Sequence, residues 1–273
     1  MRRPAPAEPA LTSTLPPSSP LTQVVVLAAG HGRRLGAITR KRPKALVEVA
    51  GVTLLEHALR FARSLGAPET LVVAGYCADD VASRLAALDM PRVRLVRNAR
   101  HAEGNLLSVD AALPHVRGTF LLTNCDHLFP HVAAAKVLSS VGPEVTAFCE
   151  FERELAADEM KVVVDAGRAL VRISKTLPEF DGGYVGLTHV PAHRLPAYRS
   201  AVAAAFATHG SSAVAEHALQ ALADARELVA TASLDGVPWY EVDTPEDLAR
   251  ARALAGSMSG PAGIPAQALA ADD

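Results

Sequence analysis

Short apolar runs alternate with longer amphipathic stretches through the first half of the chain. Residues 23–27 (Gln-Val-Val-Val-Leu) contain four consecutive apolar positions, which is typical of a strand buried on both faces of its sheet. In residues 54–62 the apolar side chains follow helical spacing, and this helix is expected to end near Gly66. Further strands are expected at residues 71–74, 93–96 and 119–122, and helices at residues 79–88 and 105–113. This alternation predicts an α/β fold with a doubly wound, mostly parallel sheet.

The second half of the chain follows a different pattern. Three strands are expected in succession at residues 145–151, 161–164 and 169–173, with a turn at Ala166 and Gly167. Two alanine-rich helices come next, and a strand at residues 228–232 follows them. Because successive strands joined by tight turns pair in antiparallel fashion, we expect a partly antiparallel lid on the substrate side of the parallel core.

Both ends of the chain differ in composition from the part between them. Residues 1–20 contain six prolines, and residues 256–273 are rich in Gly, Ser, Pro and Ala. Segments of this kind bury too little apolar surface to fold, so both are predicted to be disordered tails. Residues 21–255 contain no linker-like stretch and no internal repeat, which predicts a single domain.

Charge and composition exclude several classes of protein. The 273 residues include 27 Lys and Arg against 29 Asp and Glu, a net charge of −2, so the basic excess of a general nucleic-acid binder is missing. No apolar run approaches the length of a membrane span. Three scattered cysteines are too few for a disulfide framework and favour a cytoplasmic protein. We therefore expect no nucleic-acid or membrane partner, whereas a homo-oligomer is compatible with the sequence.

A glycine-rich turn follows the first predicted strand and contains Ala28, Ala29, Gly30 and Gly32. Glycines let backbone N–H groups approach a phosphate closely. The pattern is not a dinucleotide fingerprint, because Leu35 stands at its last glycine position, and no P-loop is present. Residues 30–47 contain no acid and six cations: Arg33, Arg34, Arg40, Lys41, Arg42 and Lys44. A solvated basic loop would explain the charge alone, but the glycines beside it favour a polyphosphate site.

The run from Leu27 to Leu35 (Leu-Ala-Ala-Gly-His-Gly-Arg-Arg-Leu) and the later Arg42-Pro-Lys-Ala-Leu46 resemble the signature of the sugar-phosphate nucleotidylyltransferase superfamily. The resemblance implies a Rossmann-like nucleotidyltransferase fold in which this loop holds a nucleoside triphosphate. It places Arg34 and Lys44 on the phosphates, as catalytic and nucleotide-binding cations. The other nucleotide-binding residues expected in the loop are Leu27, Ala28, Ala29, Gly30 and Gly32.

Two aspartates follow strands and are candidates for a magnesium site. Asp126 follows the strand that begins at residue 119, and Asp243 follows a short strand at residues 240–242. Mg²⁺ prefers one or two carboxylates together with substrate oxygens, and the resemblance implies that both aspartates bind the metal. Glu241 lies on the same face of its strand as Asp243 and is a weaker third ligand. Glu246 and Asp247 are explained by the start of a helix at Thr244.

His127 and His131 next to Asp126 also allow a zinc interpretation. Pro130 lies between the two histidines, so helical spacing that would bring them together is not assured. We therefore favour magnesium over zinc.

Lysine is rare in this chain, with five lysines against 22 arginines. A compact ammonium group suits a tight phosphate site better than a planar guanidinium. Lys161 and Lys175, like Lys44, fall in segments that carry other candidate residues, so both are predicted to bind the acceptor phosphate or the α-phosphate. The alternative is that they are ordinary exposed residues on strands.

Finer motifs in the second half, Glu159-Met-Lys161, Ile173-Ser-Lys175 and Glu179-Phe-Asp181, resemble inositol-1-phosphate cytidylyltransferases. Tyr184-Val-Gly-Leu187 and Trp239-Tyr-Glu-Val-Asp243 are instead similar to phosphocholine and phosphonate cytidylyltransferases. The resemblance implies CTP as the donor, Mg²⁺ as the cofactor, and a small phosphorylated or phosphonate acceptor.

Asn105 and Ser108 are candidates for contacts with the base or the ribose, unless they only cap a helix. Three other functions stay open at this point. A hexose-1-phosphate nucleotidylyltransferase would use UTP, GTP, ATP or dTTP, and a nucleotide-binding sensor or subunit would bind without turnover. A Rossmann-type dehydrogenase is disfavoured by Leu35.

Overall fold

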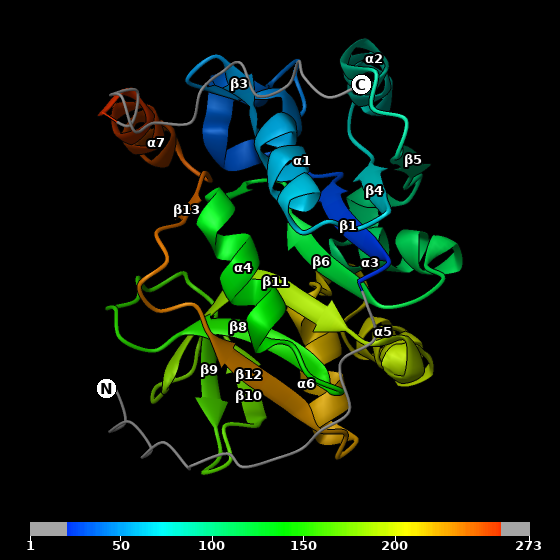
Figure 1. Ribbon diagram of the computed structural model, residues 1–273, viewed down its shortest axis with the longest axis vertical. Coiled ribbons are helices and arrows are strands. Elements are labelled where there is room, and N and C mark those ends of the chain that lie inside the picture. The colour runs from blue at the N-terminus through cyan, green and yellow to red at the C-terminus, as the bar shows by residue number, and fades with distance from the viewer. Residues whose placement is uncertain (1–20, 258–273) are drawn as a thin grey trace.

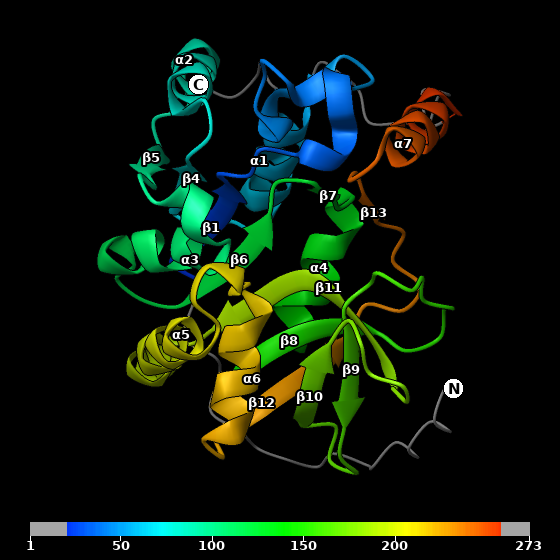
Figure 2. The same ribbon diagram turned by 180° about the vertical axis from the view of Figure 1, so that it is seen from behind.

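A computed structural model describes residues 21–257, with side chains described as far as Ala253 (Figures 1 and 2). Within these residues one sheet contains β1 (Gln23–Ala28), β4 (Glu69–Ala74), β5 (Val93–Arg97), β6 (Phe120–Asn124), β8 (Val145–Glu150), β9 (Lys161–Val164), β10 (Leu170–Ser174), β11 (Gly182–Val190) and β12 (Val229–Ser233). The predicted tails at 1–20 and 256–273 lie outside the described residues, except for residues 256–257, which end the last helix. The single domain at 21–255 stays a prediction.

The parallel half of the sheet consists of β6, β1, β4 and β5 in that order. From β1 the chain moves outward through β4 to β5 and then returns to β6, on the other side of β1. The carboxyl ends of β1 and β6 therefore lie side by side, and Leu27 pairs with Asn124 there. In open α/β sheets, ligands bind at this point of reversal.

Helices cover both faces of the sheet. The helices of the described chain are α1 (Leu54–Ser64), α2 (Ala78–Leu88), α3 (Leu106–Ala112), α4 (His131–Ser140), α5 (Leu195–His209), α6 (Glu216–Asp224) and α7 (Pro245–Ser257). Of these, α7 lies apart from the sheet and packs against the segment that follows β1. Figure 1 shows α1 and α4 in front of the sheet, and Figure 2 shows α3, α5 and α6 on its other face. All six residues of β1 are buried, as the apolar pattern predicts for a strand covered on both sides.

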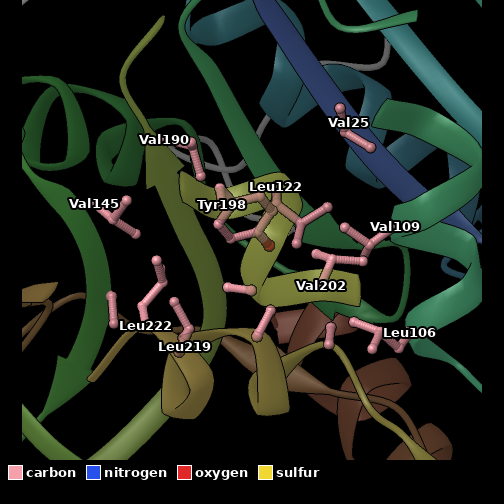
Figure 3. Close-up of a cluster of buried hydrophobic side chains, with 14 of the residues drawn as sticks. Val25, Leu106, Val109, Leu122, Val145, Val190, Tyr198, Val202, Leu219 and Leu222 are labelled. Carbon is pink, nitrogen blue, oxygen red and sulfur yellow. The ribbon is translucent and has the colours of Figure 1, made fainter. Parts of the chain in front are cut away.

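Two hydrophobic clusters occupy the two sides of the sheet. Along β1, Val24 and Val26 belong to the cluster beneath α1, whereas Val25 belongs to the cluster beneath α3 and α5, because successive side chains of a strand point to opposite faces. Figure 3 shows part of the second cluster, in which Tyr198 of α5 lies among aliphatic side chains of the neighbouring strands and helices.

The antiparallel lid is confirmed. β11 runs antiparallel to β6, β8 and β9, and β9 pairs antiparallel with β10. β12 then adds to β8 in parallel fashion. β11 itself was not predicted, because its three glycines (Gly182, Gly183 and Gly186) weaken the strand signal. The pairing of β11 with β8 shifts register between Tyr184 and Thr188, where Gly186 has a φ of 74°.

Helix α4 is another element that the pattern did not predict, and Pro130 is the residue before its first turn. Helix α1 begins as predicted, with a capping box in which Thr53 and Glu56 bond each other's backbone N–H groups. Cys77, Cys125 and Cys149 are free thiols. Among the helices of residues 21–257, none combines the length and the apolar character that crossing a bilayer requires.

His189 on β11 makes the fold sensitive to acid. Its ring is 2% exposed, and its Nδ1 atom has no hydrogen-bond partner among the described residues. Burial lowers the pKa of His189 from 6.5 to about 4, because the charged ring is poorly solvated there. In the unfolded chain the ring takes up its proton near pH 6.5, so stability is intact above that pH and is lost as the pH falls towards 4.

We predict that His189→Asn removes part of this acid sensitivity. Between about pH 7 and about pH 4 the wild type should lose about 3 kcal/mol more free energy of unfolding than the variant, measured by urea unfolding. His193→Asn, at an exposed position nearby, is the control and should follow the wild type. Parallel pH profiles for the wild type and His189→Asn would contradict the assignment.

Candidate active site

A cavity of about 340 Å³ opens at the carboxyl ends of β1 and β6. Eleven residues singled out from the sequence line it: Leu27, Ala29, Gly30, Arg34, Lys44, Asn105, Ser108, Asp126, Lys175, Glu241 and Asp243. Three other predicted residues, Ala28, Gly32 and Lys161, are not among its lining residues. The structure therefore brings most of the candidate residues to one place.

Main-chain hydrogen bonds place Asp126 at this edge. The N–H of Cys125 donates to the carbonyl of Leu27 over 3.0 Å, so the chain leaves β6 across the end of β1. The next residues form β7 (His127–Leu128), which pairs antiparallel with β13 (Tyr240–Glu241). The N–H of Val242 donates to the carbonyl of Asp126 over 3.0 Å. This small ribbon brings Asp243 opposite Asp126 although the two are far apart in sequence.

The start of α7 fixes the backbone at Asp243. The carboxylate of Asp247 accepts hydrogen bonds from the backbone N–H groups of Asp243 and Thr244, at 3.2 and 2.9 Å. In return, the Thr244 hydroxyl accepts from the N–H of Asp247 over 3.1 Å. Thr244 and Asp247 thus act as a helix cap, as the sequence predicted. Asp243 has no part in the cap through its side chain and is left for the cavity.

A third hydrophobic cluster ties α7 to the glycine-rich turn. Leu248 and Ala251 of α7 pack with Leu35 and Val47 of the basic segment at residues 30–47. Burial of such side chains contributes about 1.5–3 kcal/mol each. The cluster therefore holds Asp243 and the turn as one unit.

The turn after β1 places Lys44. Residues Arg33–Thr39 form a 3₁₀ segment, and the hydroxyl of Thr39 donates to the carbonyl of Gly32 over 2.7 Å. Gly32 has a φ of 71°, and a Cβ atom there would lie 2.8 Å from Cβ of Lys44. Glycine is thus required at position 32 both by the backbone conformation and by the stem of Lys44. Ala28 is buried at the end of β1.

Lys44 joins the two aspartates. Its Nζ atom donates to Oδ2 of Asp126 over 2.5 Å and also to Oδ1 of Asp243, while the residue is 6% exposed. Burial alone would lower the pKa of Lys44, but the carboxylates of Asp126 and Asp243 raise it above its usual value. Burial would likewise raise the pKa of Asp126, yet Lys44 and His127 hold it well below its usual range. Burial would also raise the pKa of Asp243, but Lys44 lowers it. Lys44, Asp126 and Asp243 are therefore charged at neutral pH.

Arg34 and Glu241 complete the charge cluster. The half-exposed guanidinium of Arg34 forms an ion pair with the second carboxylate oxygen of Asp243. Burial raises the pKa of Glu241 to about 7, with the Asp126 and Asp243 carboxylates adding to the effect. A hydrogen bond between the side chains of Glu241 and Asp243 raises the pKa of Glu241 further and lowers the pKa of Asp243.

The residues fit a divalent cation. The ammonium group of Lys44 stands between two carboxylates, which shows that a small cation is accommodated there. Carboxylate oxygens are the ligands that Mg²⁺ prefers. Oxygen or nitrogen atoms of Asp126, His127 and Glu241 also lie within 4.8 Å of one another, as metal ligands do. His131 begins α4, is exposed and does not belong to this group, so the structure does not bring the two histidines together.

The lining of the cavity is acidic overall. Among the described residues it carries six carboxyl groups, those of Asp126, Asp158, Glu159, Glu216, Glu241 and Asp243. Its lysine and arginine side chains are Arg34, Lys44 and Lys175. A polyphosphate would be repelled from such a surface unless a cation accompanied it.

His127 is held by its neighbours on every side. Its Nδ1 atom bonds Oδ1 of Asp126 over 2.7 Å, and its ring stacks on Trp239 with centroids 5.3 Å apart. A Cβ atom at Gly186 would lie 2.5 Å from its Nε2 atom, so glycine is needed there as well. Burial would lower the pKa of His127, but the Asp126 carboxylate raises it. The ring thus orients Asp126.

The two predicted lysines have different surroundings. Lys161 is 7% exposed, and its ammonium donates to the carbonyl oxygens of Ala156, Ala157, Glu159 and Lys175 at 2.8–3.3 Å. These bonds satisfy the group completely and fix residues 156–159 at the rim of the cavity. The side chain of Lys175 lines the cavity itself.

Asn105 and Ser108, at the start of α3, also line the cavity. Neither caps the helix through its side chain. The hydroxyl of Ser108 accepts a hydrogen bond from Nδ2 of buried Asn98 over 3.1 Å, while Asn105 is exposed. The alternative that the side chains of Asn105 and Ser108 cap the helix is therefore wrong.

Sequence reasoning missed several lining residues, notably His101, Tyr184, Glu216 and Trp239. Tyr184 and Trp239 stood within the motifs of the resemblance, which was a usable signal. Glu216 gave none, because a glutamate in the first turn of a helix is explained by the helix dipole alone.

Comparisons with known proteins show what this chain is similar to. Residues 24–221 match the family model described as the MobA-like NTP transferase domain. A relative from Rubrobacter xylanophilus, named bifunctional IPC transferase and DIPP synthase, is 34% identical over 235 residues, which are 82% of this chain and 49% of the relative. A relative of the same name from Archaeoglobus fulgidus is 30% identical over 86% of this chain and 44% of its own length. The chain spans about half the length of these curated relatives.

Solved structures share the fold. The inositol-1-phosphate CTP transferase from T. maritima superimposes with a TM-score of 0.76 at 21% identity, over 89% of this chain and 98% of that one. The CTP:phosphocholine cytidylyltransferase from Streptococcus pneumoniae gives a TM-score of 0.68 at 20% identity, over 86% and 99%. At these identities the likeness establishes a common fold.

We predict that Lys44 and a divalent cation compete for the same two carboxylates. Lys44→Met leaves Asp126 and Asp243 facing each other, so without metal it should lower the free energy of unfolding by about 3 kcal/mol. Added Mg²⁺ should then stabilise the variant more than the wild type, and Mn²⁺ should bind it more tightly. Thermal unfolding with and without chelator, and Mn²⁺ titration followed by electron paramagnetic resonance, measure the two effects.

The control is Lys136→Met, at an exposed position on α4, which should behave as the wild type. Equal responses of Lys44→Met and the wild type to Mg²⁺ would show that the ammonium group does not occupy the cation position.

Proposed function

Because the chain belongs to the family of MobA-like NTP transferase domains, we propose that it transfers CMP from CTP to the phosphate of a small metabolite and releases pyrophosphate. The observation that carries the proposal is the position of Lys44 between Asp126 and Asp243, beside the glycine-rich turn. CTP is favoured as donor by the names of two relatives in fold. A phosphorylated acceptor is favoured by the same names.

Asp126 and Asp243 are the residues that would hold Mg²⁺, with Glu241 beside them as a further carboxyl group. The ion would neutralise charge on the triphosphate and polarise its phosphoryl oxygens. Lys44 would then be released from between the two carboxylates and turn its ammonium to the phosphates. Arg34, whose guanidinium is half-exposed at the mouth of the cavity, is placed to do the same.

The nucleotide would lie along the end of β1. Leu27, Ala29 and Gly30 line the cavity there, and glycine leaves the main chain open to a phosphate. Asn105 and Ser108, which also line the cavity, would contact the base or the ribose. Because the Ser108 hydroxyl already accepts from Asn98, it keeps its own proton to donate.

The transfer itself needs no general base. A phosphate monoester has its second pKa near about 6, so most of the acceptor is dianionic at neutral pH. An acceptor oxygen attacks the α-phosphorus of CTP, a new P–O bond forms, and the bond from the α-phosphorus to its bridging oxygen breaks. Pyrophosphate leaves with the electron pair of that bond. The protein contributes position and charge neutralisation.

Lys175 is proposed to attract the acceptor phosphate, because its side chain lines the cavity. Lys161 is proposed to act indirectly. By binding four carbonyl oxygens it fixes residues 156–159, and with them Asp158 and Glu159, which line the cavity.

We predict metal-dependent release of pyrophosphate when CTP and a phosphorylated acceptor are combined. Asp126→Asn and Asp243→Asn should each lower kcat by at least about 100-fold and weaken Mn²⁺ binding, without loss of the folded state in circular dichroism. Glu246→Gln, on the exposed side of the same helix start, is the matched control and should keep wild-type rates.

The assay also separates transfer from simple binding. CTP, UTP, GTP, ATP and dTTP should be tested against inositol 1-phosphate, hexose 1-phosphates, phosphocholine and alkylphosphonates. Tight nucleotide binding without pyrophosphate release from any pair would indicate a sensor or subunit and would contradict the proposed reaction.

A further inference from the structure

Glu216 is a cavity residue that the reaction described above does not use. It is the first residue of α6, and its side chain lines the same cavity as Lys175 and Asp126. The carboxylate accepts a hydrogen bond from its own backbone amide. Within residues 21–257 no other hydrogen bond or ion pair to this carboxylate is found. It faces the cavity with capacity for at least two further donors.

The surroundings of Glu216 make this capacity costly. Burial raises the pKa of its carboxyl group, and Lys175 and His127 only partly oppose this effect. Glu216 is half-buried, and a carboxyl group that is partly withdrawn from water normally bonds a neighbouring donor. A stabilising contact with the helix dipole explains a glutamate at the start of α6, but an exposed side chain would serve that purpose equally well.

Glu216 lies on the lid side of the cavity. It interacts electrostatically with Tyr184 of β11 and with Lys175, which follows β10. The glycine-rich turn, which is proposed to hold the nucleotide, comes instead from the parallel half of the sheet. A molecule whose phosphate is drawn to Lys175 and to a cation on Asp126 would therefore present the rest of its structure to Glu216.

Resting on the proposed transfer reaction, we propose that Glu216 is the residue that selects the acceptor, by accepting hydrogen bonds from hydroxyl groups of a polyhydroxylated phosphate ester. A hydroxyl group donates to a carboxyl oxygen whether or not that group carries a proton. The contact would satisfy Glu216 only when the hydroxylated acceptor is bound.

An acceptor with a quaternary ammonium group would be attracted to the acidic cavity, but it would leave the hydrogen-bonding capacity of Glu216 unused. Such cations have no hydrogen to donate and are usually bound over free aromatic faces. The ring of Trp239 is already stacked with His127 and Phe129, and the Arg153 guanidinium lies 5.6 Å from its centroid. The hydroxyl of Tyr184 bonds Thr188 over 2.8 Å, and that ring is 9% exposed. A second anionic group on the acceptor would be repelled by Glu216.

The test compares acceptors with and without hydroxyl groups, in the full chain with CTP and Mg²⁺. Inositol 1-phosphate, glycerol 1-phosphate and glucose 1-phosphate form the hydroxylated set, and ethyl phosphate and phosphocholine form the other. Glu216→Ala should raise KM for the hydroxylated acceptor that the wild type uses best by about 10- to 100-fold. KM for CTP, and kcat/KM for ethyl phosphate, should stay within about twofold of wild type. Glu216→Gln, which still offers an oxygen, should recover part of the loss.

Asp224→Asn, at the exposed far end of α6, is the matched control and should leave every constant unchanged. Equal losses with the hydroxylated acceptors and with ethyl phosphate, accompanied by a lower Tm, would show that Glu216 only supports the structure. A larger effect on KM for CTP would place it at the nucleotide. A wild-type preference for phosphocholine that is lost in Glu216→Gln would overturn the hydroxyl assignment. Each of these results leaves the transfer reaction intact, whereas its failure would appear as no pyrophosphate release by the wild type.

Discussion

The repulsion between two carboxylates is the constraint on which the site depends. Asp126 and Asp243 come from distant parts of the chain, and at the separation that a shared cation allows they would repel each other by several kcal/mol, about 4 kcal/mol at an effective dielectric constant near 20. Lys44 offsets this repulsion because its ammonium bonds both groups. Gly32 makes room for the stem of Lys44, and the cap formed by Asp247 fixes the backbone of Asp243. Several features of the fold thus serve one charge arrangement.

The parts of the fold that followed from the sequence are those whose pattern is local. β1 was predicted because four apolar positions in a row favour a buried strand, and α1 because an apolar stripe at helical spacing favours a helix. The family implied by the motif is confirmed by the match over residues 24–221. β11 was missed because its glycines weaken the strand pattern, and at least one of them is required by a residue distant in sequence. Gly186 leaves space for the ring of His127. Such a requirement exists only after folding. The same applies to Glu216, whose sequence context is an ordinary helix start.

Charge counts along the sequence indicated a segment that lies beside the cavity, but they could not separate the roles of its single residues. Of the six cations in residues 30–47, Arg34 and Lys44 line the cavity, whereas Arg33, Arg40, Lys41 and Arg42 are not among its lining residues. From the scarcity of lysine, the same role in phosphate binding was predicted for Lys161 and Lys175. The structure separates them, because one ammonium group is saturated by carbonyl oxygens and the other side chain lines the cavity. Which hydrogen-bond partners surround an ammonium group depends on loop geometry that composition does not record.

The acidity of the cavity bears on what the site accepts. Six carboxyl groups against three lysine and arginine side chains make a poor site for a bare triphosphate, although the glycine-rich turn beside it suits phosphate well. The acidic lining and the phosphate-binding turn are compatible if the nucleotide binds together with its cation. The carboxylates then attract the cation, whereas they would repel the triphosphate alone. The same acidity disfavours acceptors with extra negative charge. An acceptor whose remaining groups are uncharged hydroxyls would avoid that repulsion and would bond the half-buried carboxyl group of Glu216. The electrostatics of the donor side and of the acceptor side therefore favour compatible ligands.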